Sequence, residues 1–494
     1  MSSKNYLVFD LGASNGRAVV ARFDGSRFSL EITHRFDNRP VLAAGAFSWD
    51  LLRLYSEVLI GIQKSLKACS TLESIGIDTW GVDFGFIDRQ GRLLGNPRHY
   101  RDEARAAALP GLLQVISPRR LFDLTGMYVS PIFSIFGLRA LRTGAAPELL
   151  AADRFLMMPD LFAWLLTGEA VNEYTQATTT LAYNQSEHRW EDGILDPLEI
   201  PRTQFRETVM PGTTVGRLQA SVRRELEAPA VPVIAPASHD TASAAAGVPA
   251  GAGAGWWAFL SLGTWGVTGM ETGAPVITDE VYSAGFGNEG GADGRNLLVN
   301  NCNGLWTVQQ CREKWTREDG SEPSWDSVVS RCLEAPRLVS LIDVDEPAFG
   351  AVQPDMGRII AEACSRTGQR VPAGRGELAR CVYESLAMKF RRRFQQLSSF
   401  TRRRIDAIRM VGGGTQNCSL CQWTADATGI PVVAGPVEST VAGNLVMQLK
   451  GTGEVSSLAE GRGIVAASSE MREYQPRDAA AWDEAFERYC RLYP

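Results

Sequence analysis

The sequence predicts an α/β protein made of two related domains, and three stretches support this prediction. A short apolar strand at Tyr6–Phe9 runs into a turn rich in glycine, hydroxyl and amide groups, and a second strand follows. A similar strand and turn return at Leu260–Gly266, and a third apolar strand, Ile405–Val411, ends in three glycines before a helical stretch. A pattern that recurs in two halves of a chain indicates duplicated domains. We therefore expect one domain in residues 1–245 and a second in residues 246–494.

The first turn, Asp10-Leu-Gly-Ala-Ser-Asn-Gly-Arg17, has the composition of a loop that holds a phosphate. Its glycines allow close approach of the backbone, and its amides and polar side chains can bind phosphate oxygens. The turn lacks the Gly-x4-Gly-Lys-Ser/Thr pattern, and no helix opens directly after its glycines. A Walker A loop and a dinucleotide-binding fingerprint are therefore disfavoured. Asp24-Gly25 then turns the chain into another predicted strand, Phe28–Thr33.

The next predicted elements are a helix at Leu51–Lys67 and a buried strand from Ser74 that ends in a polar loop. This loop contains Trp80 and Asp83. An indole ring can pack against the C–H face of a sugar, and a carboxylate can bind sugar hydroxyls, so both residues are candidate sugar contacts. A core tryptophan followed by an aspartate in a turn would explain the same pattern.

A second apolar run, from Val233, ends in Ser238-His239-Asp240-Thr241. Catalytic groups tend to lie at such strand ends, and we interpret Asp240 as a catalytic base. The alternative is that Asp240 only caps a helix that begins at Thr241. The stretch Ala244–Gly255, which is rich in alanine and glycine, is the predicted hinge between the domains.

The second half contains two further candidate phosphate loops. The turn Gly263-Thr264-Trp265-Gly266 offers backbone amides and a hydroxyl to a phosphate oxygen, although a simple hairpin turn would have the same composition. Glu377–Phe400 has the apolar stripe of a strong helix, and its basic residues are interpreted as a solvated face. The strand Ile405–Val411 leads through Gly412-Gly-Gly414 into a helix at Ser419–Ala427. There the backbone can approach a nucleotide, and a helix N-terminus faces its phosphates.

The composition disfavours several classes of protein. The formal net charge is −6, whereas a domain that binds nucleic acid is usually basic. Nine cysteines without framework spacing fit a reducing cytosol, and Cys418-x-x-Cys421 lacks the second pair or nearby histidine of a zinc site. The N-terminal residues lack the apolar core of a signal peptide, and the uncharged stretch Thr241–Met270 is too turn-prone for a membrane span. We expect a cytoplasmic protein without nucleic-acid or membrane partners.

Several of these segments together resemble the FGGY carbohydrate kinases: Asp10-Leu-Gly-Ala-Ser, Ser238-His-Asp-Thr-Ala, Gly263-Thr-Trp and Gly412-Gly-Gly-Thr-Gln-Asn. Others are similar to the branch of that family that phosphorylates L-rhamnulose: Gly76-Ile-Asp-Thr-Trp-Gly-Val-Asp-Phe84, Met158-Pro-Asp, Asn172-Glu-Tyr-Thr-Gln-Ala-Thr-Thr-Thr, Asn288-Glu-Gly-Gly and Gly435-Pro-Val-Glu-Ser. The likeness follows the chain in order from residue 5 to about residue 450. It implies two actin-like (ribonuclease-H-like) domains around a central cleft.

The resemblance also implies an activity and a set of site residues. The implied reaction transfers the γ-phosphoryl group of ATP to the 1-hydroxyl of L-rhamnulose with Mg²⁺, and Asp10 matches the carboxylate that faces the metal. Asp240 matches the family's proton acceptor. The implied sugar contacts, which join Trp80 and Asp83, are Gly81, His239, Thr241 and Asn301. The implied ATP contacts are Ala13, Ser14, Asn15, Gly16, Arg17, Thr264, Gln309 and Gly413.

Two departures from the family pattern bear on the sugar preference. Leu262 lies where these kinases often carry a small serine, and Cys302-Asn303 replaces a more apolar pair beside Asn301. One alternative is therefore another ketose or polyol kinase, similar to fuculokinase or xylulokinase. The other is an actin-like protein that binds ATP or sugar without transferring phosphate. The sequence leaves the oligomeric state open.

Overall fold

The computed structural model describes residues 3–251, 253 and 255–494, and the chain divides into two units. Unit 1 comprises Met1–Ala252, Glu271–Leu298 and Ser439–Ser469. Unit 2 comprises Gly253–Met270, Val299–Glu438 and Glu470–Pro494. Two later segments therefore fold with the N-terminal part of the chain. The boundary expected between residues 245 and 246 treats the domains as contiguous, and it stays a prediction.

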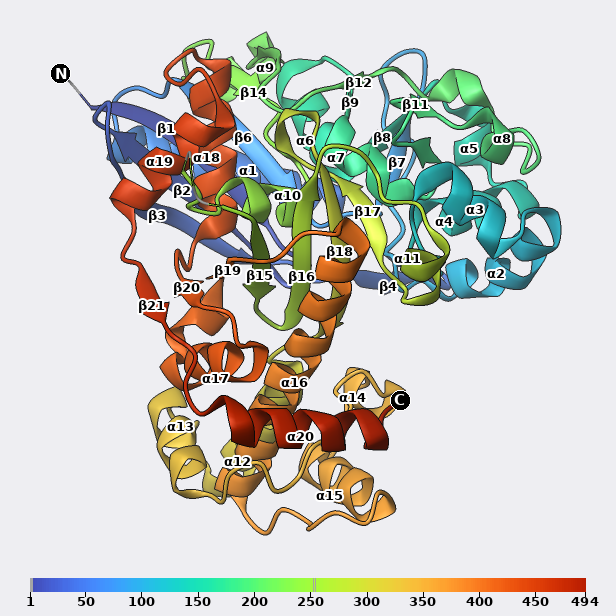
Figure 1. Ribbon diagram of the computed structural model, residues 1–494. Helices are drawn as coiled ribbons and strands as arrows, with labels where there is room; N and C mark the ends of the chain where they lie inside the picture. Colours follow the sequence, from blue (N-terminus) through green and yellow to red (C-terminus); the bar gives the residue numbers. More distant parts are fainter. Residues whose placement is uncertain (1–2, 252, 254) are drawn as a thin grey trace. The chain divides into compact units, whose positions relative to one another are not determined.

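Unit 1 is built on a sheet with the strand order β13-β14-β6-β1-β2-β3. Figure 1 labels β14, β6, β1, β2 and β3 of this sheet. Strands β1, β2 and β3 are antiparallel neighbours, whereas β1, β6 and β14 run parallel. The strands predicted in the N-terminal part of the sequence are confirmed. The strands of this sheet are β1 (Lys4–Leu11), β2 (Asn15–Phe23), β3 (Phe28–Asp37), β6 (Ser74–Thr79), β13 (Thr214–Arg217) and β14 (Pro232–Ile234).

Unit 1 also contains helices and short strands. The helices are α1 (Leu51–Ala68), α2 (Glu103–Val115), α3 (Pro118–Thr125), α4 (Ser134–Thr143), α5 (Pro147–Ala151), α6 (Met158–Thr167), α7 (Tyr174–Ala177), α8 (Asp192–Leu195), α9 (Ala220–Leu226), α10 (Asp240–Ala246), α11 (Asp279–Ser283), α18 (Ser439–Gly451) and α19 (Leu458–Ser468). The short strands are β4 (Val41–Ala43), β5 (Ala46–Ser48), β7 (Phe84–Ile87), β8 (Arg154–Met157), β9 (Asn172–Glu173), β10 (Tyr183–Asn184), β11 (Arg189–Trp190), β12 (Thr208–Val209) and β17 (Gly287–Gly290).

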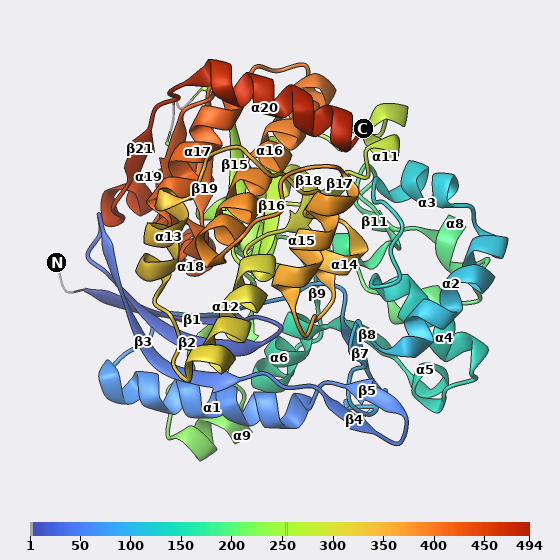
Figure 2. The same cartoon turned by 90° about the horizontal axis from the view of Figure 1, so that it is seen from below.

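Strand β1 is buried on both of its faces. Leu7, Phe9 and Leu11 belong to the apolar cluster that includes the inner side of α1. Tyr6 and Val8, which alternate with them and point to the other face, belong to a second cluster that includes α18. Figure 2 shows α1 and α18 on opposite sides of β1, β2 and β3. Burial on two faces explains why the sequence of β1 is a nearly continuous apolar run.

The parallel strands of unit 1 end at one edge of the sheet, and polar side chains gather there. In the register of β1 and β6, Asp10 lies beside Asp78. Thr79, the last residue of β6, forms a parallel bridge with His239 immediately before α10. Parallel strands therefore bring segments that are distant in sequence to one edge, the usual place for ligands in an α/β sheet.

Helices α10 and α18 cross at two glycines. A Cβ atom on Gly247 would lie 2.1 Å from the carbonyl oxygen of Ser439, and one on Gly443 would lie 1.8 Å from the carbonyl oxygen of Ser243. No side chain larger than that of glycine fits at either position without displacing a helix. This contact fixes the place of α10, which begins at Asp240.

The structure corrects part of the predicted hinge at Ala244–Gly255. Ala244, Ala245 and Ala246 form the last turn of α10 and are buried. This part of the stretch is helical because it packs against α18. Residues 252 and 254 lie outside the described residues.

Unit 2 repeats the arrangement of the first strands of unit 1. β15 forms an antiparallel hairpin with β16 and runs parallel to β19, as β1 does with β2 and β6. The neighbours in the sheet follow the order β18-β16-β15-β19-β20-β21. These strands are β15 (Trp257–Leu262), β16 (Trp265–Thr272), β18 (Asn296–Asn303), β19 (Ala407–Val411), β20 (Val432–Ala434) and β21 (Arg472–Tyr474). The helices are α12 (Trp306–Asp319), α13 (Trp325–Glu334), α14 (Pro347–Gly350), α15 (Met356–Arg366), α16 (Arg375–Thr401), α17 (Cys418–Thr428) and α20 (Ala479–Leu492).

The basic residues of α16 do not all form the predicted solvated face. Lys389 is buried, and its Nζ lies 2.9 Å from Oδ1 of Asp343 and 2.6 Å from Oδ2 of Asp345. Arg391 pairs with Asp483 at 2.7 Å. The interpretation as a solvated face is therefore wrong for these residues, because acidic side chains from other segments of unit 2 cover them.

Two further structural features concern membrane-spanning helices and the cysteine pair. None of the helices in the described part of the chain has both the length and the apolar character that crossing a bilayer requires. Cys418 and Cys421 lie in α17 with free thiols, the first exposed and the second buried.

Candidate active site

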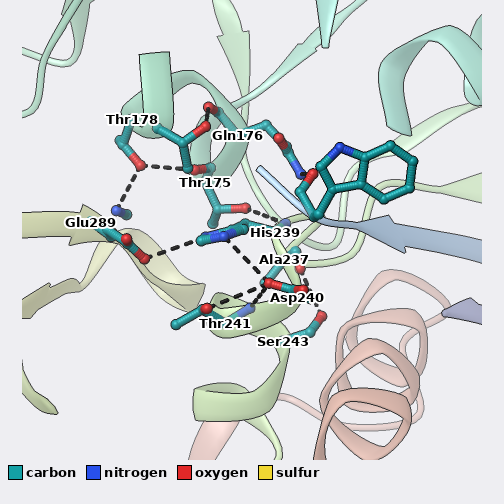
Figure 3. A network of polar contacts seen from close by, with 12 residues as sticks. Thr175, Gln176, Thr178, Ala237, His239, Asp240, Thr241, Ser243 and Glu289 are labelled. Atoms are coloured by element: carbon teal, nitrogen blue, oxygen red, sulfur yellow. Dashed lines mark hydrogen bonds and ion pairs between the residues drawn. The ribbon is translucent and has the colours of Figure 1, made fainter. Parts of the chain in front are cut away.

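Three charged side chains stand in a row at the start of α10 (Figure 3). Nε2 of His239 lies 3.3 Å from Oδ1 of Asp240, and Nδ1 of His239 lies 3.3 Å from Oε2 of Glu289 on β17. The side chain of Asp240 is 38% exposed, whereas those of His239 and Glu289 are 10% and 8% exposed. Asp240 is thus the member of the row that a ligand can reach.

The neighbouring carboxylates decide the protonation of His239. Burial alone would lower its pKa, but Glu289 and Asp240 outweigh burial and raise the pKa to about 9. Burial raises the pKa of Asp240, and Asp10 adds to this increase, whereas His239 opposes it. The imidazolium at neutral pH therefore favours the ionised form of Asp240, which a general base requires.

Neighbouring segments fix the backbone just before Asp240. The backbone N–H of His239 donates to Oγ1 of Thr175 at 3.1 Å, and Nε2 of Gln176 donates to the carbonyl oxygen of Ser238 at 2.9 Å. The N–H of Ser238 donates to the carboxylate of Glu173 at 3.3 Å. Burial raises the pKa of Glu173 to about 7. The segment that follows β9 therefore holds the residues that carry the candidate base.

Gly81 and Thr241 complete the surroundings of this row. A Cβ atom on Gly81 would lie 3.1 Å from Nε2 of His239, so only glycine leaves the imidazole undisturbed. The backbone N–H of Thr241 donates to Oδ1 of Asp240 at 2.6 Å. Asp240 is the first residue of α10 and not its cap, because the capping position belongs to His239.

Asp83 and Trp80 lie in a buried network. Oδ2 of Asp83 accepts hydrogen bonds from the indole N–H of Trp49 at 2.6 Å and of Trp80 at 2.9 Å, and Oδ1 pairs with Arg105 at 2.6 Å. Arg105 also donates to the carbonyl oxygen of Val82, whose φ of 69° is rare for a β-branched residue. Both oxygens of Asp83 are engaged and both side chains are buried. This arrangement supports a role in holding the loop rather than direct contact with a sugar.

The turn between β1 and β2 contains the predicted phosphate-binding residues of unit 1. Nε and Nη2 of Arg17 donate to Oδ2 of Asp10 at 3.1 and 2.7 Å. Residues 13–15 form the half-exposed to exposed tip of the turn. A Cβ atom on Gly16 would lie 2.3 Å from the ring of Phe36, so packing against β3 requires glycine there. The turn therefore offers backbone groups and a cation at the edge of the sheet.

Asp78 is a further acidic residue at this edge that the sequence analysis did not single out. Its Oδ2 accepts a hydrogen bond from Nδ2 of Asn444 at 2.6 Å, and its Oδ1 is buried without a hydrogen-bond partner among the described residues. Burial, together with nearby Asp10, raises the pKa of Asp78 well above its usual value and favours the neutral form. An aspartate inside an apolar strand is unusual and could have been noticed in the sequence.

In unit 2, the predicted residues Thr264 and Gln309 belong to neighbouring turns. Thr264 lies in the hairpin between β15 and β16, and the backbone N–H of Trp306 donates to its carbonyl oxygen at 3.2 Å. The N–H of Leu305 likewise donates to the carbonyl oxygen of Gly263 at 2.9 Å. Because α12 begins at Trp306, Gln309 stands in its first turn. These hydrogen bonds attach the N-terminus of a helix to the hairpin.

The triple glycine of unit 2 turns around Leu262. A Cβ atom on Gly412 would lie 2.9 Å from the carbonyl oxygen of Leu262, and one on Gly414 would lie 2.6 Å from its Cγ. A Cβ atom on Gly413 would meet nothing within 4 Å. The backbone of Gly413 is thus open to a ligand, while the other two glycines allow close packing. Leu262, which departs from the family pattern, therefore packs directly against Gly412 and Gly414 of this turn.

The structure places the predicted site residues in two groups. Unit 1 holds Asp10, Ala13, Ser14, Asn15, Gly16, Arg17, Trp80, Gly81, Asp83, His239, Asp240 and Thr241. Unit 2 holds Thr264, Asn301, Gln309 and Gly413, with Asn301 exposed on β18. Glu289, which pairs with His239, is not among the site residues predicted from the sequence. Its only signal there is the segment Asn288-Glu-Gly-Gly, which is part of the family resemblance.

Asp10, at the edge of the unit 1 sheet, fits Mg²⁺ as one member of a set of donors. Within residues 3–251, 253 and 255–494, no three His, Cys, Asp or Glu side chains gather as a metal site. Mg²⁺ commonly binds through one or two carboxylates and completes its shell with phosphate oxygens and water. Asp10 is a carboxylate donor of this kind, whereas its neighbour in the register, Asp78, favours the neutral form.

Comparison with known proteins identifies the family. The sequence profile of the FGGY family of carbohydrate kinases matches over its N-terminal domain at residues 5–247 and over its C-terminal domain at residues 258–451. A protein named Rhamnulokinase from Bacteroides thetaiotaomicron is 38% identical, covering 98% of this chain and 98% of that protein. A protein of the same name from Pectobacterium atrosepticum is 35% identical, covering 100% of this chain and 97% of that protein. Another from Enterococcus faecalis is 36% identical, covering 96% of this chain and 95% of that protein.

Solved structures agree in fold. Gluconate kinase from Lactobacillus acidophilus superimposes with a TM-score of 0.82 at 18% identity, covering 99% of this chain and 98% of that one. Plasmodium falciparum glycerol kinase with ADP gives a TM-score of 0.78 at 16% identity, covering 99% and 98%. The predicted α/β fold with two actin-like (ribonuclease-H-like) domains is confirmed. The chain therefore belongs to the FGGY family of carbohydrate kinases and is a sugar kinase.

Proposed function

We propose that this protein transfers the γ-phosphoryl group of ATP to the 1-hydroxyl of L-rhamnulose, forming L-rhamnulose 1-phosphate in cytoplasmic L-rhamnose catabolism. Support for the sugar comes from relatives named Rhamnulokinase, which match the chain over 95% or more of their own length. The observation in this chain that carries the proposal is the accessible carboxylate of Asp240 next to the buried imidazole of His239. An ionised carboxylate open to ligand is suited to accept a hydroxyl proton.

The chemical step needs alignment and charge neutralisation more than covalent help. Asp240 accepts the proton of the 1-hydroxyl as that oxygen bonds to the γ-phosphorus, and the bond between the γ-phosphorus and the bridging oxygen breaks to release ADP. The proposed sugar contacts are Gly81, His239, Thr241 and Asn301. The buried network around Asp83 and Trp80 holds the loop that carries Gly81.

The proposed nucleotide contacts include backbone groups in two turns that neighbouring side chains do not cover. The tip of the β1–β2 turn and the open face of Gly413 support this assignment. The full set is Ala13, Ser14, Asn15, Gly16, Arg17, Thr264, Gln309 and Gly413. Bound Mg²⁺, held by Asp10 and the nucleotide, would neutralise phosphate charge.

The test is a panel of ketoses and polyols in an assay that couples ADP release, with the sugar phosphate identified by mass spectrometry. L-Rhamnulose should give the highest kcat/KM. Asp240→Asn should lower kcat by about 10² to 10⁴-fold, the usual contribution of a positioned base, while ATP affinity stays nearly unchanged. Asp37→Asn is the matched control, because Asp37 pairs with Arg39 on the surface.

Each contrary result removes a different part of the proposal. An active Asp240→Asn variant would remove the assignment of the base. A higher kcat/KM for L-fuculose or xylulose would replace the sugar. ATP binding without any sugar phosphate would point to a binding protein that lacks transfer activity.

A further inference from the structure

Glu289 is a buried carboxylate that neither the sugar contacts nor the nucleotide contacts use. It lies in the middle of β17, in the Asn288-Glu-Gly-Gly segment. Its side chain is 8% exposed, and its Oε2 faces Nδ1 of His239 at 3.3 Å. These two atoms are buried and have no hydrogen bond to any other group among the described residues. A carboxylate is costly to bury without a charged partner, so this pairing calls for a role.

The residues on either side of Glu289 anchor β17. The backbone N–H of Asn288 donates to the carbonyl oxygen of Gly126 at 3.0 Å, and the N–H of Gly290 donates to Oγ1 of Thr178 at 2.8 Å. A Cβ atom on Gly290 would lie 2.7 Å from the ring of Tyr174, so β17 packs closely on α7. Figure 3 shows the Glu289 side chain directed at His239. These contacts of β17 therefore fix the position of the Glu289 carboxylate next to Nδ1 of His239.

The charges that face His239 come from three elements. Glu289 approaches from β17, Asp240 from the first residue of α10, and Glu173 from β9. The negative charge of Asp10, near the end of β1, in turn raises the pKa of Asp240. One imidazole thus stands among several carboxyl groups. If it were neutral, Asp240 would have no cation to offset burial and the charge of Asp10.

We propose that Glu289 is a positioning residue of the phosphoryl transfer, which keeps His239 doubly protonated and in place so that Asp240 remains ionised at neutral pH. The kinetic part of this inference rests on the proposed function. Glu289 does not touch the reacting atoms, since His239 stands between it and Asp240. The hydroxyl proton still passes to Asp240, and no proton moves to Glu289.

The direct test is an NMR titration of the imidazole signals, which needs no sugar. The chain has four histidines, so the signal of His239 is identified by its loss in His239→Gln. In the wild type the pKa of His239 should be about 9. In Glu289→Gln it should fall by about one to three units, the usual effect of removing an adjacent opposite charge. Glu57→Gln is the matched control, because Glu57 pairs with His34 at 2.6 Å.

The second test is the pH dependence of kcat/KM for the sugar. In Glu289→Gln the acidic limb should move to higher pH, and activity at pH 6.5 should fall about tenfold for each unit of change in the pKa of the base. At high pH the loss should be smaller. Glu289→Asp, which keeps the charge, should restore most of the activity at pH 6.5. Glu57→Gln should show the wild-type profile.

Several outcomes would overturn the proposal. One is a wild-type His239 that titrates at or below pH 6.5, a result that needs no variant to fold. Another is an unchanged His239 titration in folded Glu289→Gln. A third is a loss of activity in Glu289→Gln that is equal at every pH, which would indicate a purely structural role. If the wild type does not phosphorylate L-rhamnulose, the proposed function fails, and the NMR titration alone decides the role of Glu289.

Discussion

A Cβ atom on Gly81 would lie 3.1 Å from Nε2 of His239 and 3.0 Å from Cγ2 of Thr179. Gly81→Ala should therefore displace the imidazole by a few tenths of an ångström. Because a shift of about 1 Å in catalytic geometry can cost about 10²-fold, we expect kcat/KM for the sugar to fall by about tenfold. The KM for ATP should change little. Steady-state kinetics with each substrate varied in turn will measure both effects.

The control for this variant is Gly273→Ala. A Cβ atom on Gly273 would meet nothing within 4 Å. Its kinetics should match the wild type. Equal losses in the two variants would show that the contact between Gly81 and His239 is unimportant.

The buried pair of Asp83 and Arg105 predicts a loss of stability rather than a loss of sugar affinity alone. Asp83→Ala leaves the guanidinium of Arg105 buried and unpaired, which typically costs about 3 to 5 kcal/mol. Unfolding in urea should show this decrease. The double variant Asp83→Ala/Arg105→Met should be more stable than the single variant. Unchanged stability with a raised KM for the sugar would instead mean that Asp83 contacts the substrate.

The crossing of α10 and α18 predicts an effect of a single methyl group. Gly443→Ala would place a Cβ atom 1.8 Å from the carbonyl oxygen of Ser243, so the helices must separate. We expect a loss of about 1 to 3 kcal/mol in unfolding free energy, typical of overpacking, and a lower kcat because α10 begins at Asp240. Gly463→Ala in α19, where a Cβ atom meets nothing within 4 Å, should be neutral or stabilising. The reverse order of stability would contradict this account of the crossing.

The raised pKa of His239 predicts that stability falls in alkaline solution. Its folded-state pKa is about 9, above the ordinary value near 6.5, so its stabilisation is fully present below pH 6.5. That contribution, on the order of 3 kcal/mol, is lost as the pH rises through about 9. Burial also raises the pKa of Glu173 to about 7. The free energy of unfolding therefore decreases further as the pH rises from below the ordinary pKa of a glutamate through about 7.

Thermal unfolding between pH 6 and pH 10 measures this dependence. Tm should decrease across the interval. The decrease should be smaller in Glu289→Gln, because that variant removes the charge that raises the pKa of His239. A Tm that rises from pH 7 to pH 9 would contradict a His239 that is charged because it pairs with Glu289 and Asp240.

The candidate base could be found from the sequence because its signal is local. Asp240 directly follows an apolar run, and the glycine turns of β1–β2 and of Gly412–Gly414 stand next to apolar strands. Such patterns depend only on neighbours in the chain. The partner of His239 could not be found in this way, because Glu289 lies on another strand, beyond the hairpin of β15 and β16.

Packing against distant segments also changes the surroundings that a local pattern predicts. Trp80 and Asp83 have the composition of a sugar contact, yet Trp49 and Arg105 from other segments engage both oxygens of Asp83. Lys389 has the place of a solvated residue on a helix, yet Asp343 and Asp345 cover it. In both cases the decisive partner lies far away in the sequence.

The sequence by itself determined the strands beside the glycine turns, the turns themselves, the family and the choice of Asp240 as the candidate base. Only the tertiary structure decided that Glu289 meets His239, that Asp83 turns inward, and that α10 is held by α18. The physical reason is that the first group of features depends on local periodicity and on backbone freedom at glycine. The second depends on which distant segments share a buried space, and burial determines which charges must pair.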